Sequence, residues 1–159
     1  MGTCVAKFGV SWGDFSTTTS VITMIKLVSV TKAPVEVVEL AMYGGGVTAP
    51  ADVQHQATFA RVSAAGAGTG TASPPTPEPF GNTLAAASST ILWKMTAEPT
   101  TYATVFPVLS AFNQRGGMRW GVPRGEGVFN QFENTSMHGG WRCQSSTAGA
   151  VAGHVHWWE

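Results

Sequence analysis

The sequence predicts an all-β domain, and two observations support this fold class. Short segments rich in β-branched and aromatic residues recur along the 159 residues, separated by turn residues at intervals of about 8–12 residues. No apolar stripe continues at the spacing of a long helix. Together these features are typical of a β-sandwich or a barrel.

The first 20 residues carry three large aromatic side chains but sustain no period of 2 or 3.6 residues. We therefore expect residues 1–20 to form an extended N-terminal arm and residues 21–159 to form a single β domain. Phe8, Trp12 and Phe15 need an apolar surface to cover, which belongs either to this chain or to a partner. We expect neighbouring chains to order this arm.

Three strands are predicted before the longest loop. Residues 21–30 are dense in β-branched side chains, which favour extended structure. Residues 35–43 alternate in part, and the three glycines at 44–46 end that segment. After a second turn, residues 53–62 alternate more regularly.

A long neutral loop follows these strands. Residues 63–79 contain three glycines and four prolines, which disfavour both a helix and a central strand. Glu78 is the sole charged residue between Val62 and Trp93, whereas flexible solvated linkers are usually more charged. We expect this loop to lie on a neighbouring subunit, with Thr69, Pro75 and Pro77 in contact.

The second half of the chain predicts one helical turn at the alanine-rich residues 82–89 and further short strands. The two strands that flank the turn at residues 123–126 are expected to form a hairpin, because proline and glycine there suit a tight turn. Counting all segments gives an eight-stranded jelly roll, with about eight or nine short strands. The later strands are predicted at residues 90–96, 103–109, 117–122, 127–132, 141–144 and 150–158.

The last strand carries a candidate metal motif. His154 and His156 are two residues apart, so on a strand they point the same way and could chelate a metal. The motif resembles that of cupins, which are also jelly rolls, but Glu159 falls on the opposite face of a regular strand. We interpret the histidines as a surface or partner-facing pair and predict no metal, cofactor or catalytic residue.

Other catalytic motifs are missing from the sequence. There is no G-x-S-x-G nucleophile motif, and the glycines at 66–70 lack the Lys-Ser/Thr ending of a phosphate loop. Cys4 and Cys143 are isolated, so we expect free thiols. The longest apolar run, at residues 21–30, is too short to span a bilayer, and we expect the chain to be made in a cytoplasm.

The charge of the chain is unusually low. Nine basic and nine acidic residues give zero net charge and a charged fraction of 11%, against about 25% in ordinary soluble domains. Zero net charge implies no long-range attraction to nucleic acid or membranes. Such a surface suits a protein that is covered by other proteins, although a monomer rich in neutral polar residues is an alternative.

Two groups of residues suggest binding. Arg115, Arg119 and Arg124 lie close to Trp120 in the sequence and could form a patch for nucleic acid. We favour instead a hairpin whose arginines pair with acidic groups of a neighbour or stack on tryptophan. In the last strand, adjacent tryptophans at 157 and 158 place one ring on each face, so one ring is available to stack on a sugar.

An ordered set of segments resembles a known family. The set comprises residues 29–36, APADV at 49–53, Arg61-Val62 leading to GTGTASPPTPEP, and residues 98–99, 113–115, 119–120 and 123–127. In this order they resemble small jelly-roll proteins of tailed bacteriophages, of the capsid decoration or cement type. The resemblance covers about residues 25–159, and departs at the arginine before Gly125 and at the His- and Trp-rich end.

The resemblance implies a virion protein without catalytic residues that sits on the capsid exterior. Its expected partners are the major capsid protein and its own copies, commonly as a homotrimer, and neither nucleic acid nor a membrane. A carbohydrate-binding or adhesin module on the virion surface is the main alternative, and a cupin-like metalloprotein is a remote one.

Overall fold

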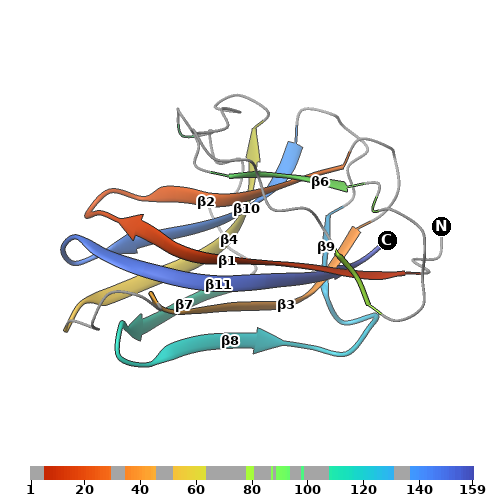
Figure 1. The fold of residues 1–159 in the computed structure, drawn as a ribbon. Coiled ribbons are helices and arrows are strands. Elements are labelled where there is room, and N and C mark those ends of the chain that lie inside the picture. Colours follow the sequence, from red (N-terminus) through yellow and green to blue (C-terminus); the bar gives the residue numbers. More distant parts are fainter. Residues whose placement is uncertain are drawn as a thin grey trace.

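The computed structural model of the chain consists of strands in two antiparallel sheets that pack face to face (Figure 1). It describes residues 6–29, 35–45, 52–63, 78–80, 87, 89–93, 98, 108–130 and 137–159. These residues form eleven strands and no helix, so the all-β prediction is confirmed. None of the described residues belongs to a helix long and apolar enough to cross a membrane.

The first sheet, sheet A, has the N-terminal and C-terminal strands at its centre. β11 lies between β1 and β3, and all its pairings are antiparallel. In spatial order the strands are β5 (Glu78–Pro79), β1 (Lys7–Thr17), β11 (Gly149–Trp158), β3 (Val35–Gly44) and β8 (Gly117–Gly121), with β9 (Val128–Asn130) also paired to β3.

The second sheet, sheet B, has five strands. Its central strand is β10, which pairs with β2 on one side and β4 on the other. In spatial order the strands are β6 (Ser89–Trp93), β2 (Ile22–Ser29), β10 (Met137–Ser145), β4 (Gln54–Ser63) and β7 (Val108–Asn113).

The core lies between the two sheets and is built by alternation along each strand. In β11, alternate residues are buried, and Trp157 has no exposed surface. Such alternation places every second side chain on the inner face. Large core side chains come from both sheets, among them Phe8, Trp12, Phe15, Met42 and Trp157 from sheet A, and Met24, Phe59, Phe112 and Trp141 from sheet B.

The expected N-terminal arm is wrong for residues 7–17, which form β1 and pair with β11 over nearly their whole length. Phe8, Trp12 and Phe15 are 2%, 6% and 8% exposed and belong to the protein's own core. They are therefore not surface contacts for a capsid or a sister subunit. The sequence pattern did not reveal this strand, because an irregularity between Trp12 and Phe15 shifts the register and interrupts the alternation of buried and exposed residues.

The expected hairpin around residues 123–126 is also wrong. β8 and β9 do not pair with each other; both pair with β3, β8 along Glu39–Tyr43 and β9 along Val35–Val37. The turn between them is fastened to β3 by Glu36, whose Oε1 accepts hydrogen bonds from the backbone N–H groups of Gly125 at 2.6 Å and Gly127 at 2.9 Å. Gly125 has φ of +93°, so the expected permissive glycine is confirmed.

Two further strands differ in extent from the prediction. The strand expected at residues 103–109 is found as β7 at Val108–Asn113, after Pro107. The short strand expected at residues 141–144 is the nine-residue β10, because Gly139 and Gly140 weaken the sequence signal without preventing pairing. The helical turn expected at 82–89 falls largely outside the described residues, as do residues 64–77 with Thr69, Pro75 and Pro77.

The burial of β1 leads to a stability prediction. Replacing Phe8 with alanine should lower the free energy of unfolding by about 3–5 kcal/mol, because it removes a core ring and leaves a cavity. Denaturant unfolding followed by tryptophan fluorescence would measure the change. Ser16→Ala, an exposed position on the same strand, should change stability by less than about 0.5 kcal/mol. Equal stability of Phe8→Ala and wild type would contradict the assignment of β1 to the core.

Candidate functional site

The outer face of sheet A carries a group of three side chains, Glu39, His154 and His156, which we call the carboxylate–histidine cluster. The two histidines project from β11 because Val155 and Trp157, which alternate with them, are buried in the core. Glu39 projects from the adjacent β3, where it is the direct cross-strand partner of His156. Neighbouring strands therefore hold all three side chains on one face.

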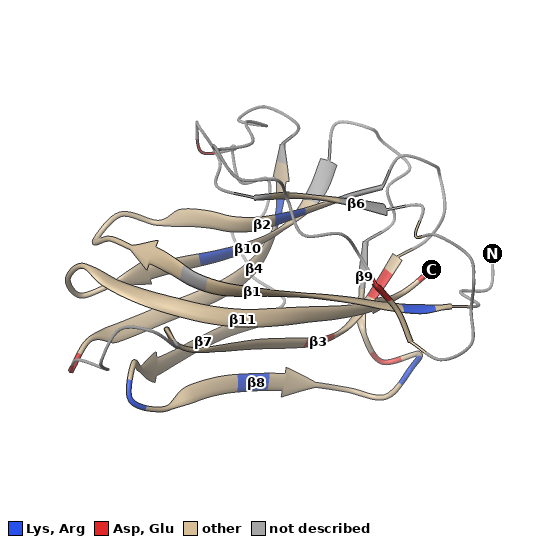
Figure 2. Cartoon of the chain, viewed as in Figure 1, with Lys and Arg blue, Asp and Glu red and all other residues tan. Residues whose placement is uncertain are grey.

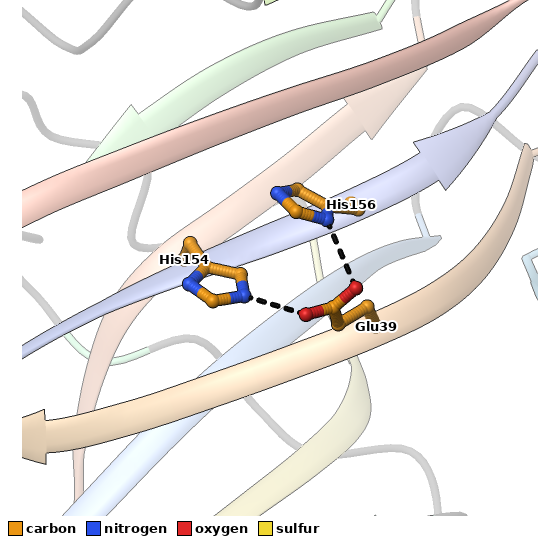
Figure 3. Close-up of side chains that lie close together, drawn as sticks. All are labelled: Glu39, His154 and His156. Carbon is orange, nitrogen blue, oxygen red and sulfur yellow. Dashed lines mark hydrogen bonds and ion pairs between the residues drawn. The ribbon is translucent and has the colours of Figure 1, made fainter. Parts of the chain in front are cut away.

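The three side chains point toward one another (Figure 3). His154 Nε2 lies 2.9 Å from Glu39 Oε1, and His156 Nδ1 lies 3.2 Å from Oε2. The imidazole rings stack with centroids 4.6 Å apart and an interplanar angle of 21°. A fourth group joins from β8, because Arg119 Nε lies 2.8 Å from Glu39 Oε1.

The cluster is partly buried, and this affects its ionisation. Burial alone would raise the pKa of Glu39, but hydrogen bonds from His154, Arg119 and His156 outweigh burial and lower that pKa to about 2. Burial, together with the nearby His154, lowers the pKa of His156 even though Glu39 opposes this change. At neutral pH the cluster therefore contains a carboxylate anion and, at His156, a neutral imidazole with a lone pair.

Two shallow hollows flank the cluster. One, of about 480 Å³, is lined by Glu39 and Arg119 together with Lys7 and Val122. The other, of about 320 Å³, is lined by His156, Phe80 and Gly9. A Cβ atom at Gly9 would collide with the rings of Phe80 and His156, so this glycine allows Phe80 to lie on the sheet.

Aromatic side chains surround the cluster on the same face. The Phe80 ring meets His156 edge-on at 4.7 Å, and Tyr43 lies 6.2 Å from the His154 ring. Phe80 and Tyr43 are 46% and 40% exposed. Trp158 is partly exposed whereas Trp157 is buried, so the prediction that one ring of this pair lies in the core is confirmed.

The three predicted contact arginines do not form one patch. Arg115 is exposed in the turn between β7 and β8, Arg119 pairs with Glu39, and the Arg124 guanidinium lies 4.7 Å above the Trp158 ring. Trp120, beside which they were expected to cluster, packs against the core. Stacking of an arginine on tryptophan was expected, but the ring is Trp158, and the acidic partner of Arg119 belongs to the same chain.

A second pair, Cys143 and His55, superficially resembles a nucleophile and its base. Cys143 Sγ lies 3.8 Å from His55 Nδ1, and the residues are 1% and 2% exposed. Burial raises the pKa of the Cys143 thiol to about 12 and lowers the pKa of His55. A nucleophilic cysteine needs a low pKa and access to substrate, so we assign this pair to the core. Cys143 is a free thiol, as expected, and Cys4 lies outside the described residues.

Sequence reasoning identified the two histidines but missed Glu39. The argument against Glu159 is confirmed, since its Oε1 accepts a hydrogen bond from Trp157 Nε1 and it does not join the cluster. Glu39 is separated from His154 by 115 positions. Its one local signal is a charged residue within the otherwise apolar strand residues 37–42.

The burial of Cys143 predicts an unreactive thiol. In a Cys4→Ser variant at pH 8, the remaining thiol should react with a disulfide reagent at least about a hundredfold more slowly in native protein than in denaturant. Absorbance of the released thiolate measures the rate, and a Cys4→Ser/Cys143→Ser variant provides the blank. Equal rates in native and unfolded protein would show that Cys143 is accessible and would make it a candidate nucleophile.

Comparisons with known proteins identify no relative of this chain. No family model, no curated protein and no solved structure matches it. Proposals about its function therefore rest on its own residues, their geometry and the sequence resemblance described above.

Proposed function

We propose that this chain is a non-enzymatic structural protein that binds and stabilises an assembled bacteriophage capsid from outside. The observation that carries the proposal is a surface very poor in charge. The chain has nine basic and nine acidic residues for an accessible surface of 7837 Å². Figure 2 shows long stretches of strand without a charged residue. An isolated protein needs surface charge to stay soluble. A surface with few charges therefore suits a protein that is covered by other proteins.

Part of the charge that is present is buried or paired within the protein. Lys26 and Glu36 are 0% and 2% exposed. Glu39 is shared among Arg119 and two histidines, and Glu98 accepts hydrogen bonds from the backbone N–H and the hydroxyl of Thr23. These groups therefore add little free charge to the surface, although other charged side chains among the described residues, such as Asp52, Arg61 and Glu126, are exposed.

The order of the strands supports the jelly-roll form of the proposal. If the short β5 and β9 and the edge strand β6 are set aside, eight strands remain. In chain order, the first, eighth, third and sixth form sheet A, and the second, seventh, fourth and fifth form sheet B. This is the arrangement expected for two interleaved Greek keys, and small jelly rolls are the fold of the cement proteins that the sequence resembles.

Cement proteins act by mass action. A protein that binds assembled shell but not free subunits shifts the equilibrium toward the shell. Each copy needs to contribute little, because a shell presents many equivalent sites. The proposed partners are therefore the major capsid protein and sister copies of this chain.

A carbohydrate-binding module on the virion surface is the second candidate. The exposed rings of Phe80 and Tyr43 and the partly exposed ring of Trp158, which lies beside Arg124, favour it, because aromatic rings stack on sugar faces. A glycan array would separate the two candidates. Strong binding that is lost in Trp158→Ala would favour the carbohydrate module.

Capsid binding is tested by co-sedimentation. Purified chain mixed with particles that lack it should migrate with the particles in a density gradient, at a saturating number of copies. Of two exposed arginines, Arg115 is a predicted contact, so Arg115→Glu should weaken binding while the matched Arg61→Glu on β4 should not. If the wild-type chain stays at the top of the gradient with intact particles, the proposed function is wrong.

Oligomeric state provides a separate prediction. The low surface charge favours a self-interface, and we expect a homotrimer of about 50 kDa, three times 16.6 kDa, at least on the particle. Light scattering during size-exclusion chromatography measures the mass in solution, and image reconstruction of particles shows the grouping of copies. A monomer at every concentration together with isolated single copies on the particle would contradict this prediction.

A further inference from the structure

We propose that Glu39, His154 and His156 form a binding site for one divalent transition-metal ion, with Zn²⁺ as the ion of choice. The proposal concerns a binding site on the outer face of sheet A and does not depend on attachment to a capsid. One carboxylate and two imidazoles are a ligand set that Zn²⁺ accepts in proteins, with water or another group in the fourth position.

The distances between the donor atoms suit such an ion. In a tetrahedral zinc site with bonds of about 2.0–2.1 Å, the ligand atoms lie about 3.3–3.4 Å apart. Here the two histidine–carboxylate distances are 2.9 and 3.2 Å, and all three donor atoms lie within 4.8 Å of one another. Figure 3 shows one nitrogen of each ring directed at a different oxygen of Glu39. Small movements of side chains would therefore place all three around one ion.

The backbone that carries these ligands is fixed by its surroundings. β11 and β3 are inner strands of sheet A, so each has a paired strand on both sides. Val155 and Trp157 anchor β11 in the core at 2% and 0% exposure, between and beside the two histidines. Ligands on rigid strands need little ordering when the ion binds, which favours affinity.

The cluster is also accessible. The side chains of Glu39, His154 and His156 are 13%, 23% and 19% exposed, and the two flanking hollows open beside Glu39 and His156. An ion can therefore enter from solvent without opening the sandwich.

Two cationic side chains near the cluster, Arg119 and Lys7, would repel a bound metal ion, and Arg119 would compete with it for Glu39. Arg119 Nε occupies one side of Glu39 Oε1 at 2.8 Å, but its side chain is 67% exposed and can turn into solvent. Lys7 lines the same hollow. Since an exposed ion pair contributes little, Arg119 should reduce metal affinity without abolishing it.

The test uses the full chain without a histidine tag. Zn²⁺ is titrated to about 100 µM under equilibrium dialysis, a range that reveals nanomolar to tens-of-micromolar dissociation constants, and bound metal is counted by elemental analysis. One Zn²⁺ per chain is expected. Glu39→Gln and His154→Ala should each weaken binding at least tenfold, whereas Glu126→Gln, at an exposed carboxylate in the β8–β9 turn, should not.

Arg119 supplies a variant that should gain affinity. Arg119→Ala should tighten Zn²⁺ binding by up to about fivefold, while Arg115→Ala, at an exposed arginine four positions away, should leave it unchanged. Co²⁺ gives a second readout, since tetrahedral N/O coordination intensifies its visible absorption. Circular dichroism checks that each variant is folded, and Glu39→Gln, which keeps the side-chain shape, serves if His154→Ala does not fold.

Three results would overturn the proposal. The first is the absence of stoichiometric Zn²⁺ in the dialysis range. The second is binding that persists unchanged in folded Glu39→Gln, which would indicate adventitious surface binding. The third is weaker binding in Arg119→Ala, which would make Arg119 a support of the site rather than a competitor for Glu39.

Discussion

The pairing of β11 with β1 and β3 is the constraint on which the rest of the structure depends. β11 is an inner strand, so pairing on both of its edges fixes its register. Val151, Val155 and Trp157 fill the core, and the intervening His154 and His156 must then face outward. The register with β3 sets Glu39 opposite His156. A shift of one residue would exchange the faces, burying the imidazoles and exposing the tryptophan, so the core and the carboxylate–histidine cluster are held by the same register.

Local pattern was sufficient to predict the strands whose alternation is uninterrupted. Residues 150–158 and 53–62 are found nearly as predicted, as β11 and β4. The pattern failed where a regular strand is interrupted. In β1, Phe8 and Trp12 alternate with small residues, but the irregularity before Phe15 makes an inner strand look like an aromatic arm. The same applies to the hairpin expected around Gly125, because a turn signal does not tell which strands the two flanking segments will join.

Only the part of the candidate site that lies on a single strand could be predicted from the sequence. His154 and His156 are neighbours on one strand, and their common direction follows from the pleat. Glu39 and Arg119 reach them from other strands, and their positions follow from pairing across long stretches of sequence, which a single sequence does not reveal. Arg119 was expected to pair with an acidic group of another chain, and it finds Glu39 within its own. Charge that is sparse in the sequence can thus be satisfied inside the fold and still leave a weakly charged surface.

The position of β1 beside β11 has a consequence for how the chain folds. The two strands come from opposite ends of the described chain, and backbone hydrogen bonds join Ala6 to Glu159 in both directions. During synthesis, β1 leaves the ribosome long before its partner β11. The side chains of Phe8 and Trp12 therefore stay exposed to solvent until β11 emerges. Loop closure over such a separation is entropically costly and slows folding. Nascent or truncated chains that lack β11 would therefore expose these aromatic side chains and be prone to aggregate.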